Sequence, residues 1–154
     1  MNILILAFLI GIIAGLRALT APAVVSWAAR LGWIDLSNTP LAFLGFAFTP
    51  YLLSLLALGE IANDKRASTP SRKIPPQFIT RVVMGAFAGA ALGLAKQSLV
   101  GGLICGAIGA VAGTLGGSAL RGALAKAFGN DLPAALLEDA IAIGGGFLIV
   151  SLAR

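Results

Sequence analysis

Residues 99–115 read LVGGLICGAIGAVAGTL, a run of apolar and small residues without a charged side chain. A helix of about 20 such residues crosses the hydrocarbon core of a bilayer and satisfies its own backbone hydrogen bonds there. The recurring glycines give this helix a face that another helix can approach closely. The stretch therefore predicts a closely packed transmembrane helix.

Four similar runs accompany it. The predicted spans cover residues 3–19, 41–59, 79–94, 99–115 and 133–152, with short apolar segments at 22–31 and 119–128. Charged residues make up 11% of the chain, against about 25% in soluble domains. The runs are continuous, whereas barrel strands alternate. The sequence predicts an all-α membrane protein in one domain, residues 1–154, with about five transmembrane helices and two short broken or interfacial helices.

The residue inventory excludes most soluble chemistry. The chain has no His and one Cys, Cys105, which excludes disulfide frameworks, Cys/His zinc sites and Ser-His-Asp triads. The net charge is +5, but the basic residues are scattered among apolar ones, so nucleic acid is not expected as a partner. We expect no catalytic residues, metal or cofactor.

A polar stretch at residues 62–80 interrupts the apolar pattern, and Pro70, Pro75 and Pro76 exclude helix interior there. Its basic residues, with the one that follows it, are Lys65, Arg66, Arg72, Lys73 and Arg81. Short loops rich in Lys and Arg stay in the cytoplasm. We therefore expect a multi-pass protein of the inner (plasma) membrane, with the N-terminus and loop 62–80 both cytoplasmic.

Two parts of the chain share a pattern. Residues 11–15, GIIAG, recur as GAVAG at 109–113, and each motif is followed by a break, a short apolar segment and another span. Because the linking span 79–94 separates them, unit 1–61 and unit 99–154 would enter the bilayer from opposite sides, as in the inverted repeats of transporters. Similar composition alone is the alternative explanation.

Each unit contains a predicted helix break. At the first, Thr20 would cap a new helix and Pro22 would occupy its first turn; at the second, the sequence GGS at 116–118 would supply flexible backbone, with Ser118 as the cap. A broken helix presents free N–H groups and a positive dipole end, which suit an anion, and Arg17 lies one turn before the first break. The alternative is that the short segments lie on the membrane surface.

Two pairs of acidic residues lie at or inside the predicted spans. A carboxylate inside the membrane costs about 3 kcal/mol, so Glu138 or Asp139 should face protein; we favour Glu138, with Arg72, Arg81 or Arg121 as its partner. Glu60 and Asp64 share one helical face before Lys65. Three roles are open for this second cluster: pairing with head groups, clamping a phosphate or carboxylate, and general-base or Mg²⁺ chemistry on a lipid phosphate.

Glycines recur along two of the predicted spans. Gly85, Gly89 and Gly93 fall on one face of the third span, and Gly102, Gly106, Gly109 and Gly113 line the fourth. Small residues at this spacing let helices associate in lipid. We expect these seams to support a homodimer, although packing within one chain could use every glycine.

The run GEIANDK at 59–65, followed by TPSR at 69–72, PP at 75–76, and Arg81, resembles the signature of small bacterial multi-pass proteins grouped as domain of unknown function 4126. The GLR at 15–17 and the glycine-rich second half are also similar, so the resemblance covers nearly the whole chain. It implies an integral membrane protein of unassigned activity.

Three functions remain open. The leading one is permeation or transport of a small anionic solute or a lipid head group through the inverted-repeat bundle. The others are a lipid-phosphate binding protein or enzyme that uses Glu60, Asp64, Arg72 and Arg81, and a structural or partner-binding membrane subunit. The candidate binding residues are Arg17, Thr20, Glu60, Asp64, Lys65, Arg72, Arg81, Ser118, Glu138 and Asp139.

Overall fold

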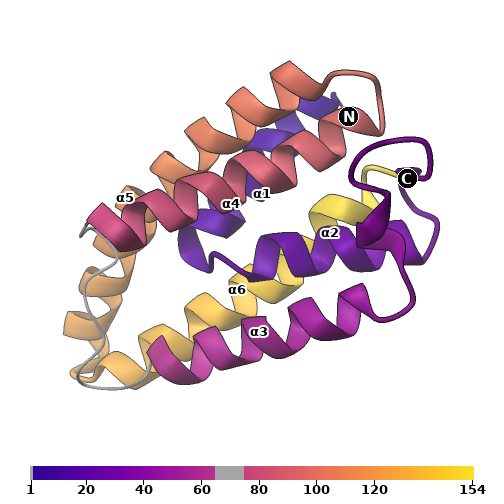
Figure 1. The fold of residues 1–154 in the computed structure, drawn as a ribbon. Helices are drawn as coiled ribbons and strands as arrows, with labels where there is room; N and C mark the ends of the chain where they lie inside the picture. The colour runs from indigo at the N-terminus through magenta and orange to yellow at the C-terminus, as the bar shows by residue number, and fades with distance from the viewer. Residues whose placement is uncertain (1, 65–74) are drawn as a thin grey trace.

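The computed structural model describes residues 2–64 and 75–154, and every element in them is helical (Figure 1). Along the chain come α1 (Ile3–Leu16), α2 (Thr20–Arg30), the 3-10 turn η1 (Ala42–Gly45), α3 (Thr49–Asp64), α4 (Pro75–Leu94), α5 (Leu99–Phe128) and α6 (Asp131–Ser151). The predicted all-α fold class is confirmed for these residues.

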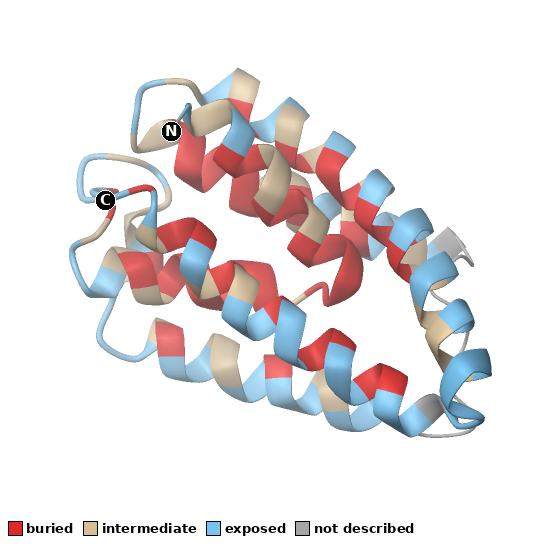
Figure 2. Ribbon diagram, turned by 180° about the vertical axis from the view of Figure 1, so that it is seen from behind, coloured by how far each residue is buried: buried red, intermediate tan, exposed pale blue. Residues whose placement is uncertain are grey.

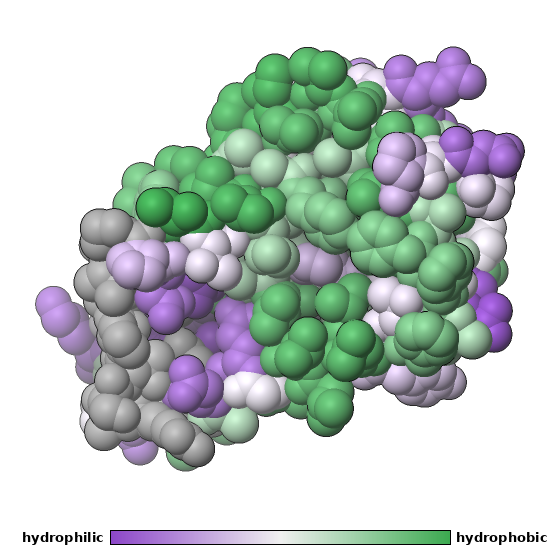
Figure 3. All heavy atoms as spheres, in the orientation of Figure 1, coloured by the Kyte–Doolittle hydropathy of each residue, from purple (hydrophilic) through white to green (hydrophobic). Residues whose placement is uncertain are grey.

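Among the described residues, three segments are long and apolar enough to cross a membrane, namely Pro76–Leu94, Leu99–Phe128 and Leu132–Ser151. Many large apolar side chains lie exposed on the outer surface, and Figure 3 shows hydrophobic residues over much of the visible face, with hydrophilic ones toward the ends. An apolar surface of this extent suits lipid rather than water. The fold therefore indicates a membrane protein.

The helices flanking residues 65–74 differ from the predicted spans. In place of the span 41–59, η1 is followed by α3, which begins at Thr49 and continues to Asp64. Pro75 and Pro76, predicted to lie in the loop, form the start of α4. Proline is tolerated in a first helical turn because the backbone N–H that it lacks would have no helical partner there.

α1 and α2 form a hairpin that enters the bundle and returns to the same end. A Cβ on Gly146 of α6 would contact both Ile13 of α1 and Val24 of α2. Ile3 and Leu6 of α1 share a pocket with the C-terminal residues Leu152–Arg154, and Trp33, just beyond α2, also lies against Arg154, 5.2 Å from its guanidinium carbon to the ring centroid. α1 thus runs from the end of α6 toward its middle, and α2 runs back (Figure 1).

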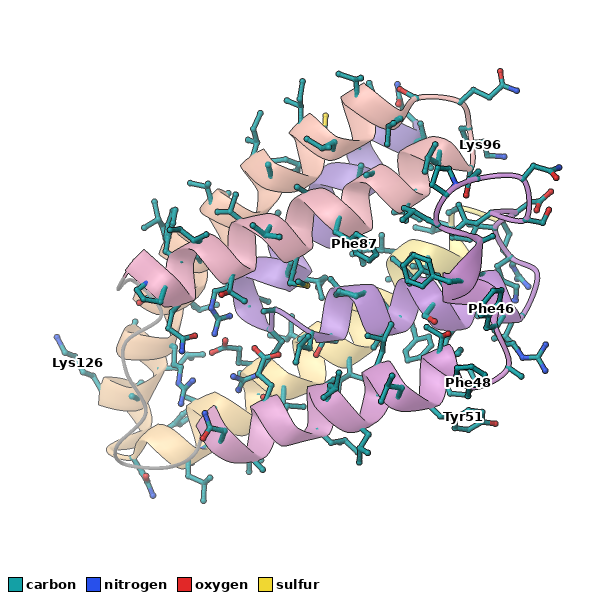
Figure 4. The ribbon with its side chains drawn as sticks, viewed as in Figure 1. Phe46, Phe48, Tyr51, Phe87, Lys96 and Lys126 are labelled. Atoms are coloured by element: carbon teal, nitrogen blue, oxygen red, sulfur yellow. The ribbon has the colours of Figure 1, made fainter. Side chains whose placement is uncertain are left out.

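This hairpin corrects the predicted topology. α1 starts at the end of the bundle where α4 ends and α5 begins, whereas α3 ends and α4 begins at the opposite end (Figure 1). Figure 4 shows Lys96 and Lys126 at these two ends. The prediction that the N-terminus and loop 62–80 share one face was wrong, because the chain turns back at Arg17 instead of completing a first crossing.

α5 corrects the second predicted break. It is a single 30-residue helix, and residues 116–128 continue it, although the ribbon changes direction in its second half (Figure 1). Gly and Ser can be accommodated in a helix, and opening the helix would leave backbone groups without partners in an apolar environment. The segment 119–128 is therefore neither a separate helix nor a re-entrant one.

The directions of α1 and α5 also contradict the inverted repeat. Positions 4, 11 and 15 of α1 lie against positions 101, 106 and 113–114 of α5, so the two helices run parallel. An inverted pair would be antiparallel. The motifs GIIAG at 11–15 and GAVAG at 109–113 pack against each other because both present small residues, so their likeness is explained by composition.

The predicted glycine seams hold α1, α4 and α5 together. Gly85, Gly89 and Gly93 of α4 meet Gly102 and Gly106 of α5, and Gly11 and Gly15 of α1 meet Gly106 and Gly113 of the same helix. Figure 2 shows buried residues on the facing sides of these helices and exposed ones outside. The seams therefore serve packing within one chain, and the homodimer stays a prediction.

Candidate functional site at the hairpin tip

The tip of the α1–α2 hairpin places a helix break inside the bundle. α1 ends at Leu16, Arg17 is extended with φ −142°, and α2 begins at Thr20. Pro22 lies in the first turn of α2, as predicted; in an unbroken helix its ring would clash with the carbonyl of Ala18. The break leaves carbonyl groups at the end of α1 and N–H groups before α2 that need partners.

Arg81 and Glu60 satisfy these backbone groups. Arg81 Nη1 donates to the carbonyl oxygens of Gly15 at 2.9 Å and Leu16 at 2.8 Å. The two carboxylate oxygens of Glu60 accept from the N–H groups of Ala18 at 2.9 Å and Leu19 at 2.8 Å. Arg81 Nη2 lies 3.9 Å from Glu60 Oε1. One cation and one anion from α4 and α3 thus close both sides of the break.

Arg17 pairs with the last span. Its Nε donates to Asp139 Oδ1 at 2.7 Å, and its Nη2 contacts the same oxygen. The Arg17 residue is 0% exposed, and Asp139 is 8% exposed. Arg121 of α5 approaches Glu138 of α6, with 3.7 Å between Nη1 and Oε2. Arg121 is one of the three partners predicted for Glu138; Arg72, another of them, lies outside the described residues.

Four residues of the cluster lie on candidate spans: Arg81 on α4, Arg121 on α5, and Glu138 and Asp139 on α6. Arg81 is about 9 Å from the start of α4 and Asp139 about 12 Å from the start of α6, at 1.5 Å per residue. A cavity of about 50 Å³ adjoins the cluster and is lined by Leu16, Arg121 and Glu138, among others. Buried ion pairs are weak evidence for stability, but ionisable residues at such depth usually mark a functional site.

The structure brings together five of the ten predicted site residues: Arg17, Glu60, Arg81, Glu138 and Asp139. Glu138 faces protein as predicted, and Asp139 does so too, because both are buried and Asp139 binds Arg17. Arg121 was not among the ten, although it was predicted as a possible partner of Glu138.

The remaining predicted residues have other outcomes. Thr20 starts α2 but makes no side-chain cap, because Leu19 holds the N-cap position and Glu60 accepts from the Leu19 N–H. Ser118 is a half-buried residue inside α5 and not a cap. Asp64 ends α3, but its side chain, like the whole of Lys65 and Arg72, lies outside the described residues. Of the two alternatives for segment 22–31, the surface location does not fit the structure, because most of α2 is buried.

Glu60→Ala tests the role of Glu60 at the tip. The substitution removes both acceptors from two N–H groups, and we expect the free energy of unfolding to fall by about 2 kcal/mol. Glu60→Gln keeps one carbonyl acceptor, so its loss should be smaller. Denaturant unfolding in detergent, followed by tryptophan fluorescence, measures both. Wild-type stability in Glu60→Ala would contradict this role.

Comparison with known proteins adds no family: the chain matches no family model, no curated protein and no solved structure.

Proposed function

We propose that this membrane protein binds an oxyanion, a phosphate or carboxylate carried by a small solute or a lipid head group, at the tip of the α1–α2 hairpin and lets it cross the bilayer. The observation that carries the proposal is the fully buried Arg17 at a helix break that ends inside the bundle. A charge buried this deeply in a membrane protein is costly, so its presence favours a role in binding or permeation.

The chemistry of the tip favours an anion. The backbone N–H groups of Ala18 and Leu19, the positive dipole end of α2 and the guanidinium of Arg81 converge on one place. Glu60 occupies that place with both carboxylate oxygens. A carboxylate held there is a chemical stand-in for a bound oxyanion, and an incoming phosphate would compete with it for the same donors.

A separate lipid-phosphate site on the cytoplasmic surface, with or without catalysis, has less support. Its proposed members Glu60 and Arg81 bind the hairpin tip and belong to the buried cluster. A purely structural role for the cluster is the remaining alternative, since its three cations face three carboxylates. The flux measurement below separates transport from that role.

The charge distribution supports one orientation. In the sequence, Lys65, Arg66, Arg72 and Lys73 fall between α3 and α4, and Lys126 lies at the end of the bundle where α3 ends. The other end has Lys96 and Arg154, which line one pocket, and Arg30 at the end of α2. By the positive-inside rule, the end of α3 and the start of α4 face the cytoplasm of a plasma membrane. The start of α1 then faces outward, opposite to the orientation predicted from sequence.

Anion flux tests the proposal. Vesicles containing the protein are assayed with a panel of soluble anions, including phosphate, and with a fluorescent anionic phospholipid whose arrival in the outer leaflet is read by dithionite quenching. We expect Arg17→Lys to reduce flux about tenfold or more, because the substitution keeps the charge but loses the planar guanidinium that binds an oxyanion with two hydrogen bonds. A tenfold loss corresponds to a transport barrier higher by roughly 1.4 kcal/mol.

Lys126→Met is the matched control. It also removes one positive charge, but from an exposed side chain at the end of the bundle where α3 ends, so flux should stay unchanged. Folding of each variant is checked by circular dichroism and gel filtration. Absence of flux for every anion and for the lipid, or equal flux in Arg17→Lys and wild type, would contradict the proposal.

A further inference from the structure

A groove between α2, α3 and α6 leads from the hairpin tip along the outside of the bundle. It has a volume of about 170 Å³, and its walls are almost entirely apolar, with Val24, Ala57, Ile61 and Phe147 among them. Leu58, which also lines it, is 61% exposed. The groove therefore opens on the apolar outer surface of the protein, where a bilayer would present acyl chains.

The two ends of the groove differ in chemistry. At one end the indole Nε1 of Trp27 donates to Ser54 Oγ at 2.8 Å, so both polar groups are satisfied, and Trp27 packs edge-on against Tyr51. At the other end lies Thr20, which is 3% exposed and whose hydroxyl finds no hydrogen-bond partner within the part of the chain that the structure describes. From Thr20 to Trp27 the groove follows α2 for about 10 Å.

A buried hydroxyl without a partner is costly, so an occupant of the groove is expected to supply one. That occupant needs a long apolar body for the walls and a polar acceptor at the Thr20 end. Thr20 directly follows Leu19, whose N–H belongs to the oxyanion site occupied by Glu60. An oxyanion at this end would accept from the Thr20 hydroxyl and lie beside the N–H groups of Ala18 and Leu19 that Glu60 binds.

We infer that the groove holds an acyl chain of an anionic phospholipid, with its phosphate accepting from Thr20 beside the hairpin tip. This inference rests on the proposed function and names its substrate class: a lipid that enters sideways from the bilayer. Because Thr20 lies at the level of the buried cluster, the head group of the bound lipid lies below the membrane surface. A lipid whose head group is crossing the bilayer would pass through such a position.

Quenching of Trp27 by brominated lipid tests this placement. Trp33→Phe leaves Trp27 as the single tryptophan, and Trp33 lies away from the groove, against Arg154. The protein is placed in vesicles that contain either brominated phosphatidylglycerol in unlabelled phosphatidylcholine, or the reverse labelling at the same lipid composition. We expect brominated phosphatidylglycerol to quench Trp27 beyond its mole fraction, and brominated phosphatidylcholine not to.

Three variants in this background locate the lipid. Ala57→Phe fills the groove and should abolish the preference, whereas Ala62→Phe, on an exposed position of the same helix, should keep it. Thr20→Val keeps the shape but removes the hydroxyl, and should weaken the preference about fivefold, the worth of one hydrogen bond. This conservative change also keeps the inference testable if Ala57→Phe does not fold.

Equal quenching by both brominated lipids in the parent protein, or an unchanged preference in either Ala57→Phe or Thr20→Val, would overturn the inference. Phosphate flux distinguishes this failure from failure of the proposed function. Arg17-dependent flux of free phosphate without a lipid preference leaves the proposed function standing and removes the lipid. A groove-dependent lipid preference without any flux supports the lipid site and removes transport.

Discussion

Arg17→Met is expected to lower the free energy of unfolding by about 3–5 kcal/mol, the cost of removing one partner from a buried ion pair. The side chain of Arg17 is fully buried, and Asp139 would keep its carboxylate in the bundle without the guanidinium that binds it. Denaturant unfolding in detergent, read by tryptophan fluorescence, measures the loss.

The double variant Arg17→Met with Asp139→Leu provides the control. It replaces both charges by apolar groups, and such replacements of buried pairs are commonly neutral or stabilising. We therefore expect it to regain most of the stability lost in Arg17→Met while losing anion flux. A double variant that is as unstable as the single one would show that the pair is not the source of the loss. Wild-type flux in a stable double variant would remove Arg17 from the transport path.

Gly109→Ala is expected to cost about 3 kcal/mol, the upper end of the range for overpacking. A Cβ at this position would overlap the Phe8 carbonyl oxygen of α1, and because backbone meets backbone no side chain can move aside. Thermal unfolding in detergent measures the change.

Gly116→Ala is the matched control in the same helix. No atom of a neighbouring group lies within 4 Å of a Cβ built there, so the substitution should be neutral or stabilising by up to about 1 kcal/mol through helix propensity. Equal effects of the two substitutions would mean that the α1–α5 contact is looser than described.

Part of the site could be predicted from local rules. Glu60, Arg81, Glu138 and Asp139 stood out because charged residues are expensive near apolar spans, and Pro22 marked a helix start. Their partners could not be predicted in this way. Arg17 lies 122 residues from Asp139 along the chain and Ala18 lies 42 from Glu60, so these contacts depend on how the helices are arranged.

The two predicted breaks show the same limit. Both looked like interruptions in the sequence, yet the chain turns at Arg17 and continues through residues 116–118. At the first break, Pro22 forbids a continuous helix and Arg81 with Glu60 binds the exposed backbone groups. At the second, Gly and Ser do not interrupt the helix, because in an apolar environment its backbone N–H and C=O groups are best satisfied by hydrogen bonds within the helix.

The amino-acid sequence by itself determined that the chain forms apolar helices and that its glycines bring helices together, because hydropathy and small-residue spacing act over one or two turns. The tertiary structure decided the course of those helices: a hairpin in place of a first crossing, and α1 parallel to α5. The physical reason is that direction in a bundle depends on which distant groups satisfy a helix end, and the acceptors and donors for the end of α1 lie on α3 and α4.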